Sequence, residues 1–138
     1  MFNFKVSVRK SDIHENGLFA DEDIKEGDII WTIGNNDFLT KIEIIDCSKL
    51  LYYESNDMFD KVKDILIYSL YKPGKFYYYL DENKFINHNT NANAFTTEDF
   101  TVIAIKDIKK DEEITENYDT YYKDNLLLNF YRKYNIEL

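Results

Sequence analysis

Three short segments of the chain gather residue types that could bind a ligand or act on it. The first, 14–20, reads His-Glu-Asn-Gly-Leu-Phe-Ala and places a glycine in a polar turn, where backbone groups can approach a ligand closely. The second, 85–93, follows an apolar pair with asparagines around His88, and asparagine side chains both donate and accept hydrogen bonds. The third, 112–122, sets carboxylates beside Tyr118, which can donate a hydrogen bond or shape a slot for a cation. Each segment alone fits an ordinary turn, loop or strand end, so their meaning depends on their combination.

Short strands joined by polar turns are expected to position these segments. Apolar residues alternate from Phe2 to Val8, which predicts a strand with one buried face. Runs rich in β-branched and aromatic residues predict further strands. These runs cover 18–20, 28–33, 76–80 and 100–105, and a turn is expected at 34–37.

The middle and the end of the chain have helical spacing. Apolar residues predict a helix over 57–71 that begins at an Asp57 cap and is stopped by the Pro-Gly pair at 73–74. The stretch 43–53 is mixed and also fits a helix. A C-terminal helix is predicted from Asp124, with an apolar stripe that packs on this domain or on a partner.

Residues 20–28 and 104–112 echo each other, since both read as a strand end, a charged turn and a new strand. Two similar charged turns would explain the echo. A fold with two pseudo-equivalent β units would explain it as well.

Composition excludes several classes of protein. With 138 residues and 44% apolar residues, the chain can bury a core as one domain. No run of 18 apolar residues is present, and the N-terminus lacks the pattern of a signal peptide, so no membrane association is expected. One cysteine and two histidines exclude a disulfide framework and make a metal site unexpected. The net charge of −9 argues against direct nucleic-acid binding and favours a cationic partner, such as a lysine-rich protein segment.

In their order and spacing, the three segments together resemble the SET-domain family of protein-lysine methyltransferases. Asn-Gly-Leu-Phe-Ala at 16–20 is similar to the family's first glycine-containing motif, and 23–29 is similar to the I-x-x-G-[DE] turn after it. Residues 85–88, with Asn93, resemble the RFxNHSxxPN motif, and 112–118 resemble EELTxDY. In size the chain is most similar to the small stand-alone viral and bacterial members.

The resemblance covers roughly residues 4–122 and implies a mostly β fold, the SET-domain (β-clip) fold of short strands with a pseudoknot. It implies a single SET domain over 1–138, with a helical insert near 40–72 and a C-terminal helix over 123–138. The insert is expected to shape the substrate groove.

The resemblance also implies a role for each motif residue. The cofactor S-adenosylmethionine would be held by Glu15, Asn16, Gly17, Asn87, His88 and Tyr118. The family's usual contacts are the asparagine side chain and the histidine backbone, and Tyr118 would be the catalytic tyrosine. The substrate channel would be lined by Thr96, Glu116, Tyr121 and Tyr122, and Tyr122 is favoured as the aromatic residue that closes it. No metal is implied.

The chain departs from the family's motifs at several positions. The first glycine is Glu15 here, which could engage the cofactor's amino group or crowd the site if a positive φ is needed. The motif's Ser-Cys pair is 89–90, its proline is Ala92 and its arginine is Lys84. Glu116 occupies a position that is often aromatic or apolar, and it could bind an ammonium group if it faces the channel. If it faces solvent, no special role follows.

The implied activity is methyl transfer from S-adenosylmethionine to a lysine side chain of a basic protein or peptide. That reaction needs in-line alignment and a neutral amine, although a free lysine has a pKa of about 10.4. One alternative is a SET-like module that binds cofactor or peptide but has lost the chemistry. Another is an unrelated acidic interaction protein that mimics nucleic-acid charge. A homodimer through the C-terminal helix stays open, and the expected location is cytoplasmic or host intracellular, including the nucleus for a virus of a eukaryote.

Overall fold

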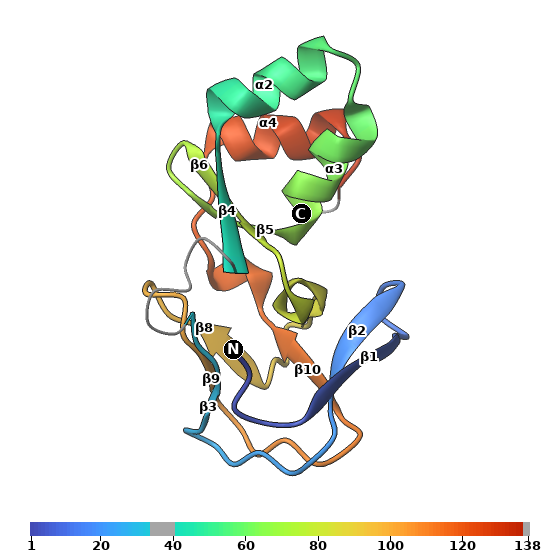
Figure 1. Cartoon of the computed structure of the whole chain (residues 1–138), viewed down its shortest axis with the longest axis vertical. Coiled ribbons are helices and arrows are strands. Elements are labelled where there is room, and N and C mark those ends of the chain that lie inside the picture. Colours follow the sequence, from blue (N-terminus) through green and yellow to red (C-terminus); the bar gives the residue numbers. More distant parts are fainter. Residues whose placement is uncertain (34–40, 137–138) are drawn as a thin grey trace. The chain divides into compact units, whose positions relative to one another are not determined.

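The computed structural model describes residues 1–33 and 41–136 (Figure 1). The turn expected at 34–37 therefore lies outside the described residues. The chain divides into two compact units. The first unit combines 1–41 with 81–120, and the second combines 42–80 with 121–138.

The first unit is built on a sheet of seven short strands in the order β1-β2-β10-β8-β9-β3, with β7 paired to β10 beside that path. Two 3-10 helices, η1 (Glu82–Phe85) and η2 (Tyr118–Thr120), flank the sheet. The strands are β1 (Val6–Lys10), β2 (Asn16–Ala20), β3 (Ile29–Trp31), β7 (Asn87–His88), β8 (Ala94–Thr96), β9 (Val102–Ala104) and β10 (Glu113–Glu116). Buried residues of the core include Leu18, Ile30, Trp31, Val102 and Ile114. The predicted strands near 18–20, 28–33 and 100–105 are present. The first is longer than predicted and the other two are shorter, and the N-terminal strand begins only at Val6.

The two echoing segments, 20–28 and 104–112, lie side by side and antiparallel in this unit. At their centre Ile24 and Ile108 exchange both backbone hydrogen bonds, at 2.8 and 2.7 Å. Equivalent bonds recur on the two sides of this centre, as a local two-fold relation requires. They run from Ala20 N to Glu112 O (3.0 Å) and from Ala104 N to Asp28 O (2.9 Å), and from Asp111 N to Ala20 O and Gly27 N to Ala104 O (both 2.7 Å). The structure thus favours two pseudo-equivalent β units over two unrelated turns.

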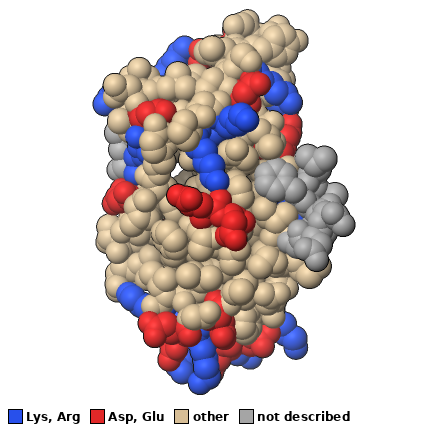
Figure 2. All heavy atoms as spheres, turned by 90° about the vertical axis from the view of Figure 1, so that its left-hand side faces the viewer, with Lys and Arg blue, Asp and Glu red and all other residues tan. Residues whose placement is uncertain are grey.

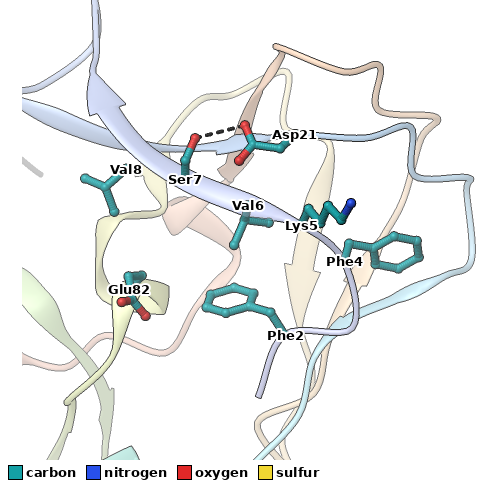
Figure 3. A pocket seen from close by; sticks show the side chains of 8 residues that line it. All are labelled: Phe2, Phe4, Lys5, Val6, Ser7, Val8, Asp21 and Glu82. Atoms are coloured by element: carbon teal, nitrogen blue, oxygen red, sulfur yellow. Dashed lines mark hydrogen bonds between the residues drawn. The ribbon is translucent and has the colours of Figure 1, made fainter.

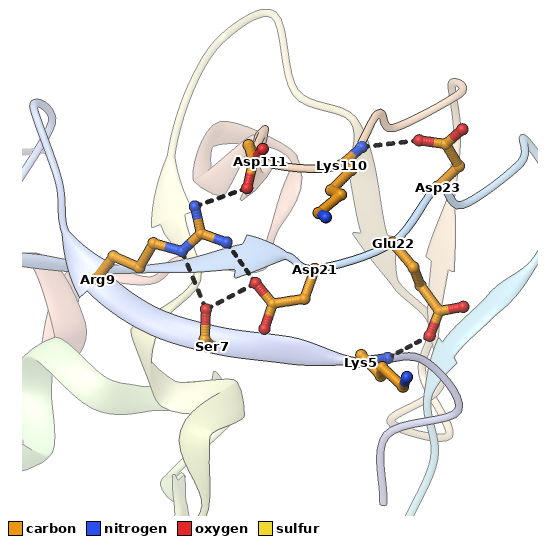
Figure 4. A network of polar contacts seen from close by, with 8 residues as sticks. All are labelled: Lys5, Ser7, Arg9, Asp21, Glu22, Asp23, Lys110 and Asp111. Carbon is orange, nitrogen blue, oxygen red and sulfur yellow. Dashed lines mark hydrogen bonds and ion pairs between the residues drawn. The ribbon is translucent and has the colours of Figure 1, made fainter.

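An ion-pair network joins the β1–β2 hairpin to both of these segments (Figure 4). The Arg9 guanidinium donates to carboxylates of Asp21 and, at 3.0 Å, Asp111, while its Nε donates to Ser7 Oγ at 3.0 Å. The hydrogen bond from Arg9, with a second from Ser7, holds the pKa of Asp21 below its ordinary value. These groups are largely solvated, so the network fixes the register of β1 and β2 more than it adds stability.

Among the described residues of the second unit, three helices pack against a three-stranded sheet in the order β4-β6-β5. Its elements are β4 (Ile42–Asp46), α2 (Cys47–Ser55), α3 (Phe59–Tyr68), β5 (Ser69–Lys72), β6 (Lys75–Tyr79) and α4 (Asn125–Lys133). Its core comprises Ile45, Leu50, Val62, Ile65, Leu66, Tyr71, Phe76, Leu127 and Phe130. The C-terminal helix α4 therefore packs within its own unit, which is the first of the two packing modes expected from the sequence. The Asp124 side chain caps this helix by accepting from Leu127 N at 3.0 Å.

The helix predicted over 57–71 is shorter and begins differently. Asp57 has a φ of 59° and is not the N-cap. The N-cap is Met58, whose side chain makes no capping hydrogen bond. The last residues of the predicted helix form β5, because the turn at Gly74, with a φ of 76°, folds the chain into a hairpin with β6. The segment 40–72 accordingly contains two strands as well as α2 and α3.

Among residues 1–33 and 41–136, no helix has the length and apolar character needed to cross a membrane.

Candidate functional site

The side chain of Asn87 connects the second motif segment to the first through hydrogen bonds. It lies on β7 and is buried, with 8% of its surface exposed. Its Nδ2 donates to the backbone carbonyl of Asn16 at 2.9 Å and to Oε2 of Glu113 at 3.0 Å. Ser11 Oγ and the His14 carbonyl lie farther away, both at 3.3 Å. Since an amide nitrogen has two hydrogens, the two shorter contacts are the principal bonds.

The other end of the Asn87 side chain is open. Within the part of the chain that the structure describes, no group donates a hydrogen bond to its Oδ1. Its surroundings are rich in acceptors, which are the two backbone carbonyls and the Glu113 carboxylate. A ligand that carries an amino group and positive charge fits such a site, because it can donate to Oδ1 and is attracted by the neighbouring oxygens.

Gly17 leaves the space that this arrangement needs. A β-carbon on residue 17 would lie 2.5 Å from Oε2 and 2.8 Å from Cδ of Glu113. The carboxylate in that space also accepts from Ser11 Oγ, at 2.7 and 3.0 Å to its two oxygens. Glycine at this position is therefore explained by close approach of a side chain, and we call Ser11, Gly17, Asn87 and Glu113 the cradle.

Glu15 sits in the turn beside the cradle with a φ of 34°, in the left-handed region that favours glycine. Its side chain is exposed, and its carbonyl accepts from Ser11 N at 3.0 Å. The positive φ considered from the sequence is thus present, and the glutamate tolerates it with its side chain in solvent.

We expect Glu15→Gly to raise the free energy of unfolding. Relief of the left-handed strain, of about 1 kcal/mol, exceeds the cost of the added entropy of the unfolded chain, of about 0.5 kcal/mol, and leaves a gain of roughly 0.5 kcal/mol. Urea unfolding measures this, with Glu15→Ala as the matched control because alanine keeps the β-carbon and removes the carboxylate. A loss of stability in Glu15→Gly that Glu15→Ala shares would mean that the carboxylate itself stabilises the turn.

His88 of the second motif segment contacts Tyr118 of the third. Strand β7 pairs in parallel with β10, so that Asn87 lies opposite Thr115 and His88 opposite Glu116. Just beyond β10, Tyr118 N donates to Nδ1 of His88 at 3.0 Å, and the two rings lie 5.3 Å apart. Because Nδ1 accepts, the proton of a neutral His88 imidazole sits on Nε2. The Tyr118 hydroxyl donates to the carbonyl of Ile86.

Glu116 and Thr96 form a buried polar pair. Glu116 is 7% exposed and Thr96 is 5% exposed. The Thr96 hydroxyl donates to the Glu116 carboxylate. The carboxylate does not face solvent, so the solvent-facing alternative for Glu116 is wrong.

Tyr121 and Tyr122 belong to the second unit, where Tyr122 stacks on Tyr71 with ring centroids 6.0 Å apart. Burial, together with the carboxylate of Asp124, raises the pKa of Tyr71 to about 12. Their part in a substrate channel stays a prediction. The structure places Glu15, Asn16, Gly17, Asn87, His88, Thr96, Glu116 and Tyr118 in the first unit.

The structure adds two residues that the sequence did not single out for a role, Ser11 and Glu113. Both contact Asn87 directly. In the sequence, Glu113 stands out only as part of the third motif segment, and Ser11 only as the start of a polar turn. Asn93, the last residue of the second motif segment, ties its loop to β10 by donating to Glu113 O and accepting from Thr115 N, both at 2.9 Å.

A surface pocket of about 750 Å³ lies elsewhere in the first unit, along β1 (Figure 3). Aromatic and aliphatic side chains line it beside a few polar ones. Its lining residues are Phe2, Phe4, Lys5, Val6, Ser7, Val8, Asp21 and Glu82. None of the motif residues takes part, so this pocket is separate from the cradle.

On the face shown in Figure 2, acidic and basic side chains interleave at the lower end of the view. The two charged turns, 20–28 and 104–112, combine both signs in their sequences. An exclusively acidic docking surface is therefore not seen at that end.

Comparison with known proteins agrees with the motif geometry. The model of the SET domain family matches residues 15–119. This match spans most of the chain and includes the cradle except Ser11, together with His88 and Tyr118. The chain belongs to the SET domain family, and the predicted mostly β SET fold is confirmed.

Solved structures with a similar fold are chains of Polycomb repressive complex 2. A chain of the Chaetomium thermophilum complex gives a TM-score of 0.61 at 26% identity, covering 88% of this chain and 16% of that one. A chain of an active complex in the stimulated state gives 0.60 at 26%, covering 83% and 15%. A ctPRC2 chain in an autoinhibited conformation bound to S-adenosylmethionine gives 0.62 at 25%, covering 92% and 17%. The present chain thus spans 15–17% of the length of these chains. No curated protein matches it in sequence.

Proposed function

We propose that the chain transfers a methyl group from S-adenosylmethionine to a lysine side chain of a protein. The observation that carries this proposal is the paired strand junction β7–β10, which holds the cradle around Asn87 and the His88–Tyr118 contact within one unit. Membership of the SET domain family supports it, as does the similar ctPRC2 chain that binds S-adenosylmethionine.

The cradle would hold the methyl donor. S-adenosylmethionine supplies an activated methyl group on a positively charged sulfur. Asn87 Oδ1 would accept from its amino group, and the backbone of Asn16 and of His88 would provide further contacts. Glu15, Gly17 and Tyr118 complete the proposed binding residues. The acceptor-rich cradle suits a ligand that carries positive charge.

Tyr118 would position the substrate amine. Its hydroxyl hydrogen is committed to the Ile86 carbonyl. The hydroxyl oxygen can therefore accept from an amine N–H and aim the nitrogen lone pair away from the ring. Holding the amine in line with the methyl group replaces a bimolecular encounter with an oriented one, which is the main source of catalysis such a site can offer.

The proposed partner is a lysine-containing basic protein or peptide, without direct contact to nucleic acid or membrane. We further propose that residues 1–138 act as one SET domain, that Thr96, Glu116, Tyr121 and Tyr122 line the substrate channel, and that the protein acts in the cytoplasm or inside a host cell. Membership among the small viral or bacterial forms, and a homodimer, are parts of the same proposal.

Transfer of tritiated methyl groups to an array of basic peptides, each with one lysine, tests the activity. Label is expected in lysine peptides and absent from matched peptides with arginine in that place. Saturable binding of S-adenosylmethionine with no label in any lysine peptide would contradict the proposal and indicate a binding module without chemistry.

A further inference from the structure

Strand β1 lies at one end of the seven-stranded sheet, and one of its two edges has no strand beside it among the described residues. Along its other edge it pairs with β2, in antiparallel register from Val6 opposite Ala20 to Lys10 opposite Asn16. A strand edge without a partner presents a row of N–H and C=O groups that another extended chain can bind. Addition of a strand to such an edge is a common mode of peptide recognition.

The hydrogen-bond pattern identifies the backbone groups that face this open edge. Just before β1, Lys5 O accepts from Asp21 N at 2.8 Å. Just after it, Ser11 N donates to Glu15 O at 3.0 Å. Because bonded and non-bonded positions alternate along an antiparallel strand, the odd-numbered residues bond toward β2. The groups that point away from β2 belong to the even-numbered residues of the strand, which are Val6, Val8 and Lys10.

These outward groups have no partner in the part of the chain that the structure describes. Within residues 1–33 and 41–136, no backbone or side-chain group bonds to the outward N–H and C=O groups of Val6, Val8 and Lys10. Val8, at the centre of the strand, is 37% exposed. The edge therefore offers a donor and an acceptor from each of these residues, which an incoming strand can bind in place of water.

The pocket along β1 adds side chains to this edge (Figure 3). Side chains alternate between the two faces of a strand, and residues from both faces of β1 line the pocket. One face contributes Val6 and Val8, and Figure 3 shows Phe2 and Glu82 on that side of the strand. An extended segment laid along β1 would thus turn every second side chain toward an apolar wall.

Glu82 gives the apolar side of the pocket a negative charge. It is exposed at the start of η1, and no cation pairs with its carboxylate among the described residues. By the same alternation, Lys5 and Ser7 lie on the opposite face of the strand. The other carboxylate of the pocket, Asp21, is already ion-paired with Arg9. A basic side chain is therefore favoured on the Glu82 side, and a polar or acidic one opposite Lys5.

We propose that the open edge of β1 is a docking site for an extended segment of a basic partner protein. The segment adds as a further strand, with its backbone bonded to Val6, Val8 and Lys10. Its apolar side chains pack on Phe2 and the two valines, and a lysine or arginine beside them reaches the Glu82 carboxylate. The net charge of −9 favours a cationic partner over a second copy, because two copies of like charge repel each other. This inference does not depend on the proposed methyl transfer.

Val8→Pro tests the edge, with Val8→Ala as its matched control. Proline removes the outward N–H of residue 8 and none of the bonds to β2, and edge strands tolerate proline where the N–H faces solvent. Alanine shortens the same side chain and keeps the N–H. The probe is a phage-displayed library of random peptides of about nine residues, long enough to form one strand. The affinities of the selected peptides are measured by calorimetry.

The selected peptides should alternate apolar residues with polar ones and carry a lysine or arginine. Their affinity is expected to fall at least about tenfold in Val8→Pro and no more than about threefold in Val8→Ala. Glu82→Gln should weaken the same peptides by about threefold, an effect that disappears in about 0.5 M salt. Glu26→Gln is the control for charge, since Glu26 is exposed in the first unit and lies outside the pocket.

Methylation of the peptide's own amides locates its backbone bonds on the native protein. Alternate N–H groups of a strand face the neighbouring strand. N-methylation at one set of alternate positions should therefore lower the affinity at least about tenfold, and at the other set by no more than about threefold.

The proposal is overturned if no selected peptide distinguishes the native protein from a folded Val8→Pro variant. A protein that sediments as a dimer, and as a monomer after Val8→Pro, would assign the edge to a second copy and equally overturn the basic partner. Should Val8→Pro not fold, the N-methylated peptides decide on the native protein alone. Equal effects at the two sets of positions would exclude addition of a strand.

Discussion

Tyr118→Phe is expected to lower the rate of methyl transfer by roughly 100-fold to 1,000-fold, equivalent to about 3–4 kcal/mol of transition-state stabilisation. The substitution removes one oxygen atom, and with it the acceptor that would orient the substrate amine. The donor site depends mainly on Asn87, so the affinity for S-adenosylmethionine should change by no more than about threefold, a difference of less than 1 kcal/mol.

Loss of the hydroxyl also removes the hydrogen bond to the Ile86 carbonyl, so the variant should be somewhat less stable. Tyr52→Phe is the matched control, because Tyr52 is 62% exposed on α2 and belongs to the second unit. A native rate in Tyr118→Phe would remove this residue from the chemistry, whatever its effect on stability.

Gly17→Ala is expected to lower the free energy of unfolding by about 2 kcal/mol, although alanine usually suits a strand better than glycine. The added β-carbon would lie 2.5 Å from Oε2 of Glu113, so this carboxylate must leave its place. Its bonds to Ser11 and Asn87 are then lost together, and a buried network that is broken on one side leaves unsatisfied groups behind.

A double-mutant cycle with Glu113→Ala tests this explanation in urea unfolding. Gly17→Ala should cost almost nothing in the Glu113→Ala background, because the clashing carboxylate is absent, and the coupling between the two sites should be near 2 kcal/mol. Equal costs in both backgrounds would mean that residue 17 is restricted by its backbone instead of by Glu113.

The sequence predicted the parts of the site that lie within short motifs. Asn87, His88 and Tyr118 were identified from spacing and family resemblance, and the structure brings their segments together across β7 and β10. The contacts of Ser11 and Glu113 were not predictable in this way. Ser11 lies 76 positions before Asn87 in the chain, and nothing local in a polar turn shows which distant side chain will fill it.

The fold shows the same division between local and long-range information. The echo between 20–28 and 104–112 left two interpretations, and the reciprocal bonds between Ile24 and Ile108, with the equivalent bonds on either side of them, distinguish the two. The helix over 57–71 was predicted too long because apolar spacing continues into Ser69–Lys72. Pairing with β6 gave those residues a better set of partners than another helical turn would have done.

Titration of the native protein with S-adenosylmethionine by calorimetry is the most direct test of the central claim, alongside Asn87→Ala and the control Asn91→Ala. Asn91 is an exposed asparagine in the same loop and does not touch the cradle. We expect saturable binding with a Kd on the order of micromolar in the native protein and in Asn91→Ala, and a loss of at least about 100-fold in Asn87→Ala. No binding by the native protein up to about millimolar S-adenosylmethionine, or equal binding by Asn87→Ala, would contradict the account.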